Sequence, residues 1–195
     1  ALFPGWRIVA PSNAFDYIGL FNTAMRSLDP VVILEHHTLY TKKFPIPEDN
    51  LDYSIPFGKA KVVTRGDDIT LLVYGSIVER LKALYDELNT RNISAEIIDL
   101  RTLDLPAIDY ETIGESVKKT GAVAIVEEAP KSQSLGDKIA AVTTERYFDH
   151  LDAPPGCITS MDVPNPVSRK LEETVLIKDP DIVSMIEAMA KRKWR

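Results

Sequence analysis

From residue 58 onward, short apolar runs alternate with amphipathic helical patterns, and this alternation constrains the fold of the chain most strongly. Strands that alternate with helices favour a mostly parallel sheet, and continuous apolar strands indicate that helices cover both of its faces. We therefore predict a three-layer α/β domain. Its strands are expected within four segments: 58–75, as two strands around a turn at 65–68, then 94–100, 121–128 and 156–164.

Capping signals mark where the helices of this domain should begin. Ser76 and Glu79 are spaced as a capping box, and Ser134 with Asp137 has the same spacing of an acceptor and an acidic residue. Asp179 precedes a proline and is expected to cap the last helix. Helices are therefore predicted to start at these three places, with a further short helix after residue 109.

The first 40 residues carry a separate strand–helix–strand pattern. A strand is expected within 6–12, a helix capped by Asn13 follows, and a second strand is expected within 30–37. One such unit is only part of a sheet, so Val9, Val31, Ile33 and Leu34 are expected to lie on uncovered apolar surface and to favour association into a homodimer.

Residues 41–56 contain three prolines and little periodicity, which indicates an extended linker. The predicted organisation is therefore a partial β-α-β unit at 1–40, a linker at 41–56 and an α/β domain at 57–195.

Composition excludes several classes of function. The formal net charge is −6, which argues against a general affinity for nucleic acid. The apolar runs are too short to span a membrane, and the first residues do not resemble a signal peptide. Cys157 is the only cysteine, so no internal disulfide can form, and a cytoplasmic setting is favoured.

The histidines and the glycine at a helix start are weak candidates for a site. His36 and His37 are neighbours on a predicted strand and should point to opposite faces, while His150 is far away in sequence, so a shared metal ion is not favoured. Gly75 and Ser76 lie between a strand and a helix and could bind an anion there. A single glycine does not make a phosphate loop, so a helix cap is the preferred interpretation.

Charged residues at strand ends are the stronger candidates. Glu127 and Glu128 end one strand but should face opposite ways, which disfavours a catalytic pair. Asp99 and Arg101 follow another strand and share a face; they could belong to an active site, a local ion pair or a subunit contact. We favour a structural role for this pair, and a core position for Cys157.

Several stretches resemble a known family. "FPGWRIVAPSNAFDYIGLFNTAMRSLDPVVILEHHTLY" is similar to the end of the pyrimidine-binding domain in the beta subunit of thiamine-dependent 2-oxo acid dehydrogenases. "IDLRTL", "SVKKT", "VAIVEEAP" and "DVPNP" resemble the C-terminal domain of that subunit, which is of the transketolase C-terminal type. The resemblance covers essentially the whole chain and implies the first component of a pyruvate, branched-chain or acetoin dehydrogenase complex, in which the alpha and beta parts are separate or fused.

The resemblance also implies an oxidoreductase chemistry. Thiamine diphosphate, held with magnesium by the alpha part, would decarboxylate a 2-oxo acid and pass the acyl group to a lipoyl arm. The glutamate and histidine that act in the family's beta part precede the matched segment, so no catalytic or cofactor-binding residue is expected in this chain. By itself it is expected to be inactive and to serve assembly.

Further expectations concern an ion and the partners. The family holds potassium through backbone carbonyls, and by position these would belong to Ala24, Met25, Ser27 and Asp29. The implied partners are an alpha subunit, a second beta copy and the lipoyl acyltransferase. Since the family's C-terminal domain builds a subunit interface, the resemblance assigns Asp99 and Arg101 to that contact.

Two alternatives remain, and the sequence departs from the family pattern in two loops. The chain could belong to another transketolase-like enzyme, such as a deoxyxylulose phosphate synthase, or be a non-catalytic α/β binding module. The departures are the single glycine in "APKSQSLGDK" and Val167 where an aromatic residue is common. They concern loop geometry rather than the fold class.

Overall fold

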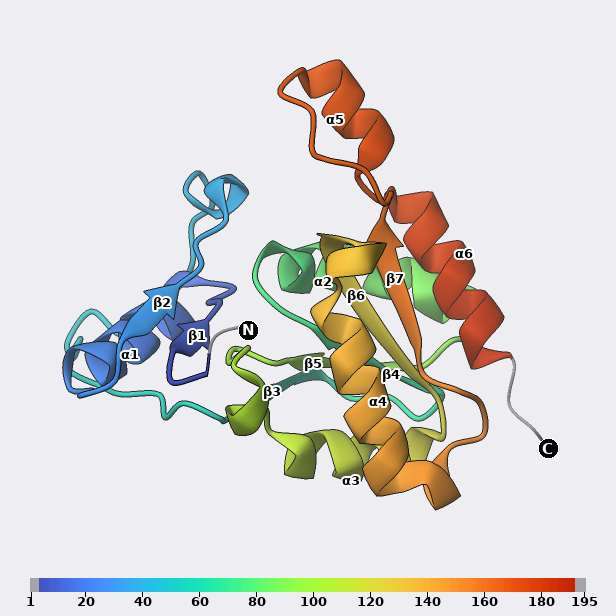
Figure 1. The fold of residues 1–195 in the computed structure, drawn as a ribbon, viewed down its shortest axis with the longest axis horizontal. Coiled ribbons are helices and arrows are strands. Elements are labelled where there is room, and N and C mark those ends of the chain that lie inside the picture. The colour runs from blue at the N-terminus through green and yellow to red at the C-terminus, as the bar shows by residue number, and fades with distance from the viewer. Residues whose placement is uncertain (1–3, 192–195) are drawn as a thin grey trace.

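A five-stranded sheet forms the larger part of the computed structural model, which describes residues 4–191 (Figure 1). The strands run in the order β3-β5-β4-β6-β7, and only β3 is antiparallel to its neighbour. Their bounds are β3 Lys61–Thr64, β4 Ile69–Val73, β5 Ala95–Asp99, β6 Val123–Pro130 and β7 Gly156–Ser160. The mostly parallel α/β sheet predicted from the alternating pattern is thus confirmed.

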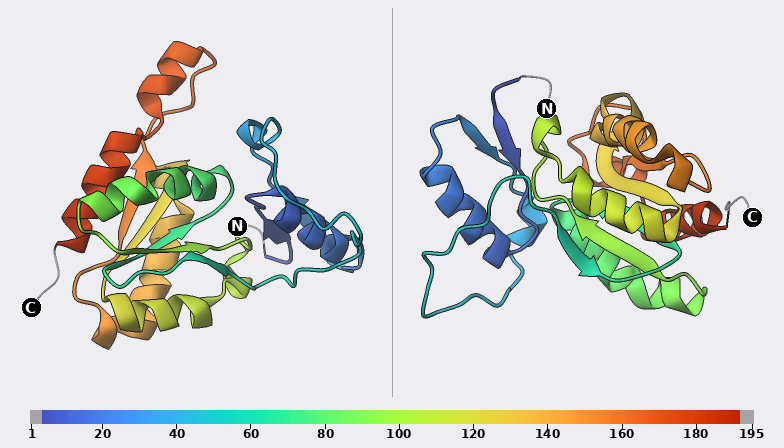
Figure 2. Two further views of the ribbon diagram at one scale, coloured as in Figure 1. Left: turned by 180° about the vertical axis from the view of Figure 1, so that it is seen from behind. Right: turned by 90° about the horizontal axis from the view of Figure 1, so that it is seen from below.

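Helices cover both faces of this sheet (Figures 1 and 2). Helices α2 (Ser76–Thr90) and α6 (Asp179–Ala190) pack on one face, and α3 (Tyr110–Thr120) and α4 (Leu135–Tyr147) pack on the other. Successive side chains of a strand serve opposite layers, because the side-chain period of a strand is two. Leu71 lies in the α2–α6 core and Leu72 in the α3–α4 core, and both are fully buried. A strand buried on both faces must be apolar throughout, which explains the continuous apolar runs.

The strands predicted around the turn at 65–68 form but do not pair with each other. Strand β5 lies between β3 and β4, with Lys61 opposite Asp99 on one side and Ile69 opposite Ala95 on the other. The connection crosses the start of β5 at Gly66, where a Cβ atom would lie 2.3 Å from the carbonyl carbon of Ala95. Glycine permits this close crossing, so the local turn signal does not produce a hairpin.

The first residues form a second unit beside the main sheet. Strands β1 (Arg7–Val9) and β2 (Val31–Ile33) are parallel, and helix α1 (Ala14–Met25) connects them. This confirms the predicted strand–helix–strand pattern. Figure 1 shows this unit to one side of the larger domain.

The expectation of an uncovered apolar face on this unit is wrong for Val9, which has no exposed surface. Residues 41–56 have little regular structure, as predicted, but they fold back so that Ile55 joins Val9 and Leu20 in a small core. The Ile55 amide donates to the carbonyl of Gly19 at 3.0 Å, and a Cβ atom at Gly19 would lie 2.5 Å from Ile55 Cγ1. The glycine inside α1 is therefore the position where the linker docks. Leu34 remains half-exposed.

Helix starts agree with the capping signals in two of four places. The side chains of Asn13 and Ser134 accept hydrogen bonds from the amides of the third helical residue, as predicted. Ser76 is instead the first residue of α2, after Gly75, and no side-chain cap bond forms there. Asp179 likewise lies inside α6, one residue after the cap position. A short helix, α5 (Arg169–Val175), was not predicted and projects from the body of the molecule in Figure 1.

Ser134→Ala and Ser76→Ala should therefore differ, although the sequence gives both serines the same signal. Losing the Ser134 cap should lower the free energy of unfolding by about 1–2 kcal/mol, because Asp137 N loses its acceptor. The Ser76→Ala change should cost less than about 0.5 kcal/mol. Urea denaturation of both variants measures the difference; equal losses would contradict the cap assignment.

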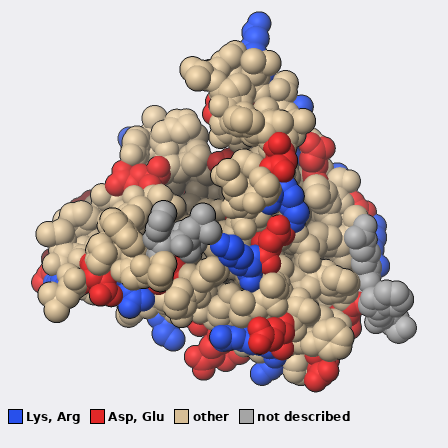
Figure 3. Space-filling model, viewed as in Figure 1, with Lys and Arg blue, Asp and Glu red and all other residues tan. Residues whose placement is uncertain are grey.

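None of the helices within residues 4–191 combines the length and apolar character needed to cross a bilayer. On the face drawn in Figure 3, acidic and basic side chains are interspersed rather than gathered into one patch.

Candidate functional site at the joint between the two units

The carboxyl end of β5 is where the two units meet. Strand β1 lies against the segment that follows β5: the Ala10 amide donates to the Arg101 carbonyl and the Leu103 amide donates to the Ile8 carbonyl, both at 2.8 Å. Val9 and Thr102 form an antiparallel bridge between these bonds. Backbone pairing therefore ties the N-terminal unit to the loop at this sheet edge.

A cluster of buried charged residues lies inside this joint, and we call its members, Ser12, Asp16, Asp99 and Arg101, the joint cluster. The two aspartates have no exposed surface and Arg101 is 8% exposed. Ser12 Oγ donates to Asp99 Oδ2 at 2.6 Å, and the Arg101 guanidinium donates to Asp16. The Arg101 amide also donates to Asp99 Oδ1 at 3.1 Å. Charged groups of each unit are therefore hydrogen-bonded by side chains of the other unit.

Arg101 adopts a backbone conformation that is uncommon for a side chain of its size. Its φ angle is +56°, in the left-handed region that normally favours glycine. Its Nε atom is buried and has no partner among the described residues. Strain of this kind persists only where the surroundings hold it, and here the Arg101 carbonyl, amide and guanidinium all bond across or within the joint.

The pKa of Asp99 is raised to about 7. Burial is the main cause, because it penalises the charged form, and the nearby Asp16 adds to the rise. The hydrogen bond from Ser12 and the proximity of Arg101 act in the opposite direction. Burial prevails, so protons compete for this carboxyl in the neutral pH range.

Asp99 and Arg101 thus belong to a buried cluster of charged residues between the two units of the same chain. A contact with a second subunit stays a prediction, and Asp99 has no exposed surface with which to make one directly. The partners Ser12 and Asp16 were missed. In the sequence, Asp16 stands out only as an acidic residue in the first turn of a helix. Its contact with Arg101 could not be predicted from the sequence, because the two residues are 85 positions apart.

Glu127 and Glu128 have different partners, as expected for neighbours on a strand. Glu127 is fully buried and accepts bonds from Ser134 Oγ, from the Gly136 amide at 3.0 Å and from Tyr74 Oη at 2.9 Å. The pKa of Tyr74 is raised, mainly by burial and then by the charge of Glu127. Glu127 thus anchors the start of α4 to the sheet.

Glu128 instead reaches the N-terminal unit. Its Oε2 atom lies 3.0 Å from His36 Nε2, and its Oε1 atom lies 3.7 Å from a guanidinium nitrogen of Arg80. The second ring nitrogen of His36 lies 2.7 Å from Thr38 Oγ1. This is a second polar link between the units, and the pattern of neighbouring histidines gave no indication of it.

The remaining candidate residues from the sequence do not come together into one site. The rings of His36 and His37 stack at 5.0 Å, and no group of three histidine, cysteine, aspartate or glutamate residues suited to a metal occurs within residues 4–191. Gly75 has a φ angle of +57° and faces a small cavity near Glu128. The Cys157 thiol has a pKa raised to about 12, chiefly by burial, which does not suit a nucleophile.

The proposed potassium ligands surround the end of α1. The Ala24 carbonyl accepts the Ser27 amide at 3.1 Å, and the Asp29 amide is bonded to the Ser27 hydroxyl. Met25 is mostly exposed. These contacts form a turn and do not test an ion site.

Comparison with known proteins identifies the larger domain. Residues 58–182 match the model of the family described as "Transketolase, C-terminal domain". This match spans more than half of the chain, and the chain therefore belongs to the transketolase C-terminal domain family.

Relatives extend the similarity over the N-terminal unit. The chain is 40% identical over 184 residues to the pyruvate dehydrogenase E1 component subunit beta of Rickettsia bellii, covering 94% of this chain and 55% of that protein. It is 39% identical over 191 residues to the mitochondrial subunit of the same name in Dictyostelium discoideum, covering 97% and 53%. The chain thus spans about half the length of these relatives.

A solved structure supports the fold. It is titled "Split gene transketolase, inactive beta4 tetramer", has a TM-score of 0.77 and is 22% identical in sequence. The similarity covers 99% of this chain and 60% of that one. At this level of identity the likeness establishes the arrangement of elements, including the N-terminal unit beside the larger domain.

Proposed function

We propose that this chain is the C-terminal part of the beta subunit of a thiamine-dependent 2-oxo acid dehydrogenase, with pyruvate as the substrate of the whole enzyme. The observation that carries the proposal is similarity across both units and the linker to subunits named for pyruvate dehydrogenase. This support favours pyruvate over the branched-chain and acetoin alternatives. The proposed domain limits are 1–40, 41–56 and 57–195.

The role proposed for this segment is assembly. In the whole enzyme, thiamine diphosphate with magnesium supplies the decarboxylation chemistry. The residues of this chain do not fit that group: the chain has no Gly-Asp-Gly motif, and the part between residues 4 and 191 has no cluster of metal-ligating side chains. No catalytic step is therefore assigned to it, and potassium at the end of α1 remains a proposal.

The proposed partners are an alpha subunit or fused alpha part, a second beta copy and a lipoyl acyltransferase. The joint cluster supports assembly, since it holds the N-terminal unit in one orientation on the larger domain. A cytoplasmic location is proposed from the composition alone. Relatives carry names with mitochondrial and chloroplastic locations as well.

A chimaeric subunit tests the function. The matching segment of the Rickettsia bellii subunit is replaced by residues 1–195 and produced with the alpha subunit of that enzyme. We expect an assembled complex that decarboxylates pyruvate at a rate within about tenfold of the parent. This expectation follows because the proposal assigns the subunit contacts to residues 1–195, while the catalytic residues come from the parent.

The control is a chimaera carrying Arg101→Met. It should assemble less well, since the joint between the units would be weakened. A chimaera that folds with native helix content but neither assembles nor turns over pyruvate would contradict the proposal.

A further inference from the structure

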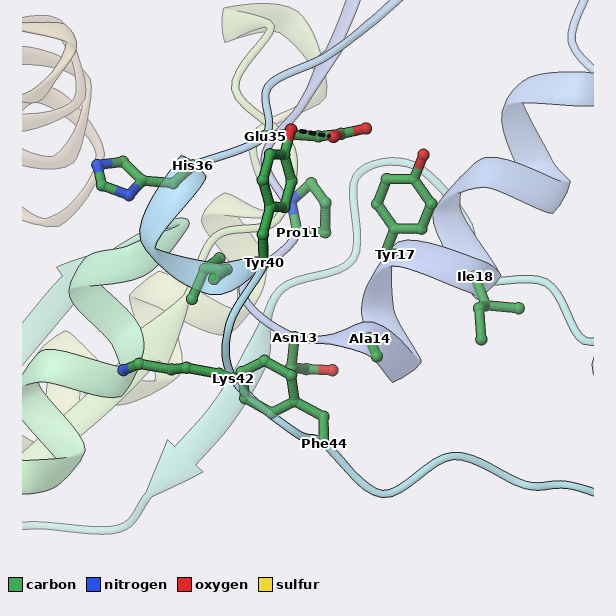
Figure 4. Close-up of a pocket in the computed structure, with 11 residues that line it drawn as sticks. Pro11, Asn13, Ala14, Tyr17, Ile18, Glu35, His36, Tyr40, Lys42 and Phe44 are labelled. Carbon is green, nitrogen blue, oxygen red and sulfur yellow. Dashed lines mark hydrogen bonds between the residues drawn. The ribbon is translucent and has the colours of Figure 1, made fainter.

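A cavity of about 250 Å³ lies between α1 and the segment after β2 (Figure 4). Most of its wall is apolar, and it has one polar end, where Glu35, Tyr17 and Tyr40 come together. In Figure 4 the Tyr40 hydroxyl reaches Glu35, whereas the Lys42 amino group points away from that end. The apolar wall residues are Pro11, Ala14, Ile18, Leu39 and Phe44.

Glu35 places a negative charge at this polar end. Tyr40 Oη donates to Glu35 Oε2 at 2.6 Å, and the Tyr17 hydroxyl interacts with the same carboxylate. Both hydroxyls lower the pKa of Glu35, so the carboxylate is ionised at neutral pH. Among residues 4–191, no lysine or arginine forms an ion pair with Glu35; Lys42 lines the same cavity, but its amino group points away from the carboxylate, and the neighbouring His36 ring is engaged by Thr38 and Glu128.

An organic cation with an apolar stem is the complement of this arrangement. A carboxylate offers about four acceptor positions, and two hydroxyls leave positions for further donors. Tyrosine rings attract cations on their faces. Arginine suits the site better than lysine, because its planar guanidinium can bond a carboxylate through two donors while stacking on an aromatic ring.

The size of the cavity and its surroundings indicate that the cation is a side chain of a protein rather than a small molecule. Small-molecule sites usually measure about 300–1,000 Å³, and this cavity is smaller. It is of the size to take one long side chain, whose methylene stem would lie on the apolar wall. Phe21, which stacks on Tyr17 beside the cavity, is 40% exposed, and aromatic residues are enriched at protein interfaces.

We propose that this cavity, the Glu35 pocket, binds an arginine side chain of a partner protein, presented by a segment in which apolar residues flank the arginine. The guanidinium would bond the Glu35 carboxylate between the rings of Tyr17 and Tyr40. The flanking apolar residues would cover Phe21. The site lies outside the joint cluster and does not depend on the function proposed above.

Peptide titration of the 195-residue chain tests this pocket. The probe is acetyl-Ala-Leu-Arg-Leu-Ala-amide, and its control contains citrulline, a neutral analogue of arginine of nearly the same shape. We expect the arginine peptide to bind about tenfold more tightly than the citrulline peptide and to shift the NMR signals of the Tyr17 and Tyr40 rings. Equal binding of both peptides, or unchanged tyrosine signals, would overturn the proposal.

Glu35→Gln provides the matched variant, because glutamine keeps the shape and removes the charge. It should abolish the preference for arginine, whereas Glu173→Gln, at an exposed glutamate of α5, should leave it unchanged. Glu35 is exposed, so both variants should fold, as circular dichroism would verify. Butylguanidinium binding as tightly as the peptide would assign the pocket to a small cation instead. Self-association that is lost in Glu35→Gln would assign it to a second copy.

Discussion

Replacing Arg101 by methionine should lower the free energy of unfolding by about 3 kcal/mol at pH 8. The change removes the cation that partners Asp16 and lies beside Asp99, and both carboxylates have no exposed surface. Breaking a buried ion pair by removing one member typically costs about 3–5 kcal/mol, because the remaining charge is left uncompensated. For a chain of this length the midpoint of thermal unfolding should fall by roughly 6–12 °C.

Arg169→Met is the matched control for this experiment. Arg169 forms an ion pair with Glu173, but its side chain is 90% exposed. Exposed pairs contribute about 0–1 kcal/mol, so this variant should behave almost like the parent in urea denaturation. A loss below about 1 kcal/mol for Arg101→Met would show that the joint cluster does not stabilise the contact between the units.

The stability of the chain should also depend on pH through Asp99. Its pKa is about 7 in the folded chain against an ordinary value of 3.8, so the folded state binds the proton more tightly. Unfolding therefore releases a proton between about pH 4 and pH 7, and the contribution of Asp99 to stability falls as the pH rises through that range. The slope from one such group is at most about 1.4 kcal/mol per pH unit.

Asp99→Asn isolates this effect from the other titrating groups. The groups that face Asp99 are Asp16 from α1, the adjacent Arg101, and Lys61 opposite it on β3. The stability of the asparagine variant relative to the parent should rise from pH 4 to pH 7 and level off above. Urea denaturation at intervals of half a pH unit measures it.

An exposed carboxyl serves as the control for direction. Hydrogen bonds from Ser132 lower the pKa of Asp162, so its contribution is present above pH 4 and is lost as the pH falls. Asp162→Asn should therefore change the profile slightly and in the opposite sense. If Asp99→Asn leaves the slope between pH 4 and pH 7 unaltered, the raised pKa of Asp99 is refuted.

Much of the fold could be predicted from local pattern. The apolar runs of β4, β5 and β6 and the amphipathic repeat of α2 identify their elements, because each pattern matches the period of one structure. The start of α4 is identified by its capping residue Ser134. The pairing of the two strands around the turn at 65–68 could not be predicted in this way. Local residues indicate a turn at 65–68, but which strand pairs with β3 depends on β5, which lies some 30 residues further along the chain.

The candidate site was predictable only in part. Asp99 and Arg101 stand out in the sequence as charged groups after an apolar strand, and their structural role could be inferred. Their partners Ser12 and Asp16 could not be, because an N-terminal segment must first dock on the sheet edge. The link between His36 and Glu128 and the gathering of Tyr17, Glu35 and Tyr40 depend on such docking in the same way.

The sequence by itself thus determined the class of fold, the order of most elements and the resemblance to a family. It could do so because secondary structure and layer architecture follow from the spacing of apolar residues along the chain. Only the tertiary structure decided that Gly19 receives the linker, that two aspartates are buried with one arginine, and that the pKa of Asp99 approaches 7. These properties arise from desolvation and from contacts between residues far apart in sequence, which no local pattern encodes.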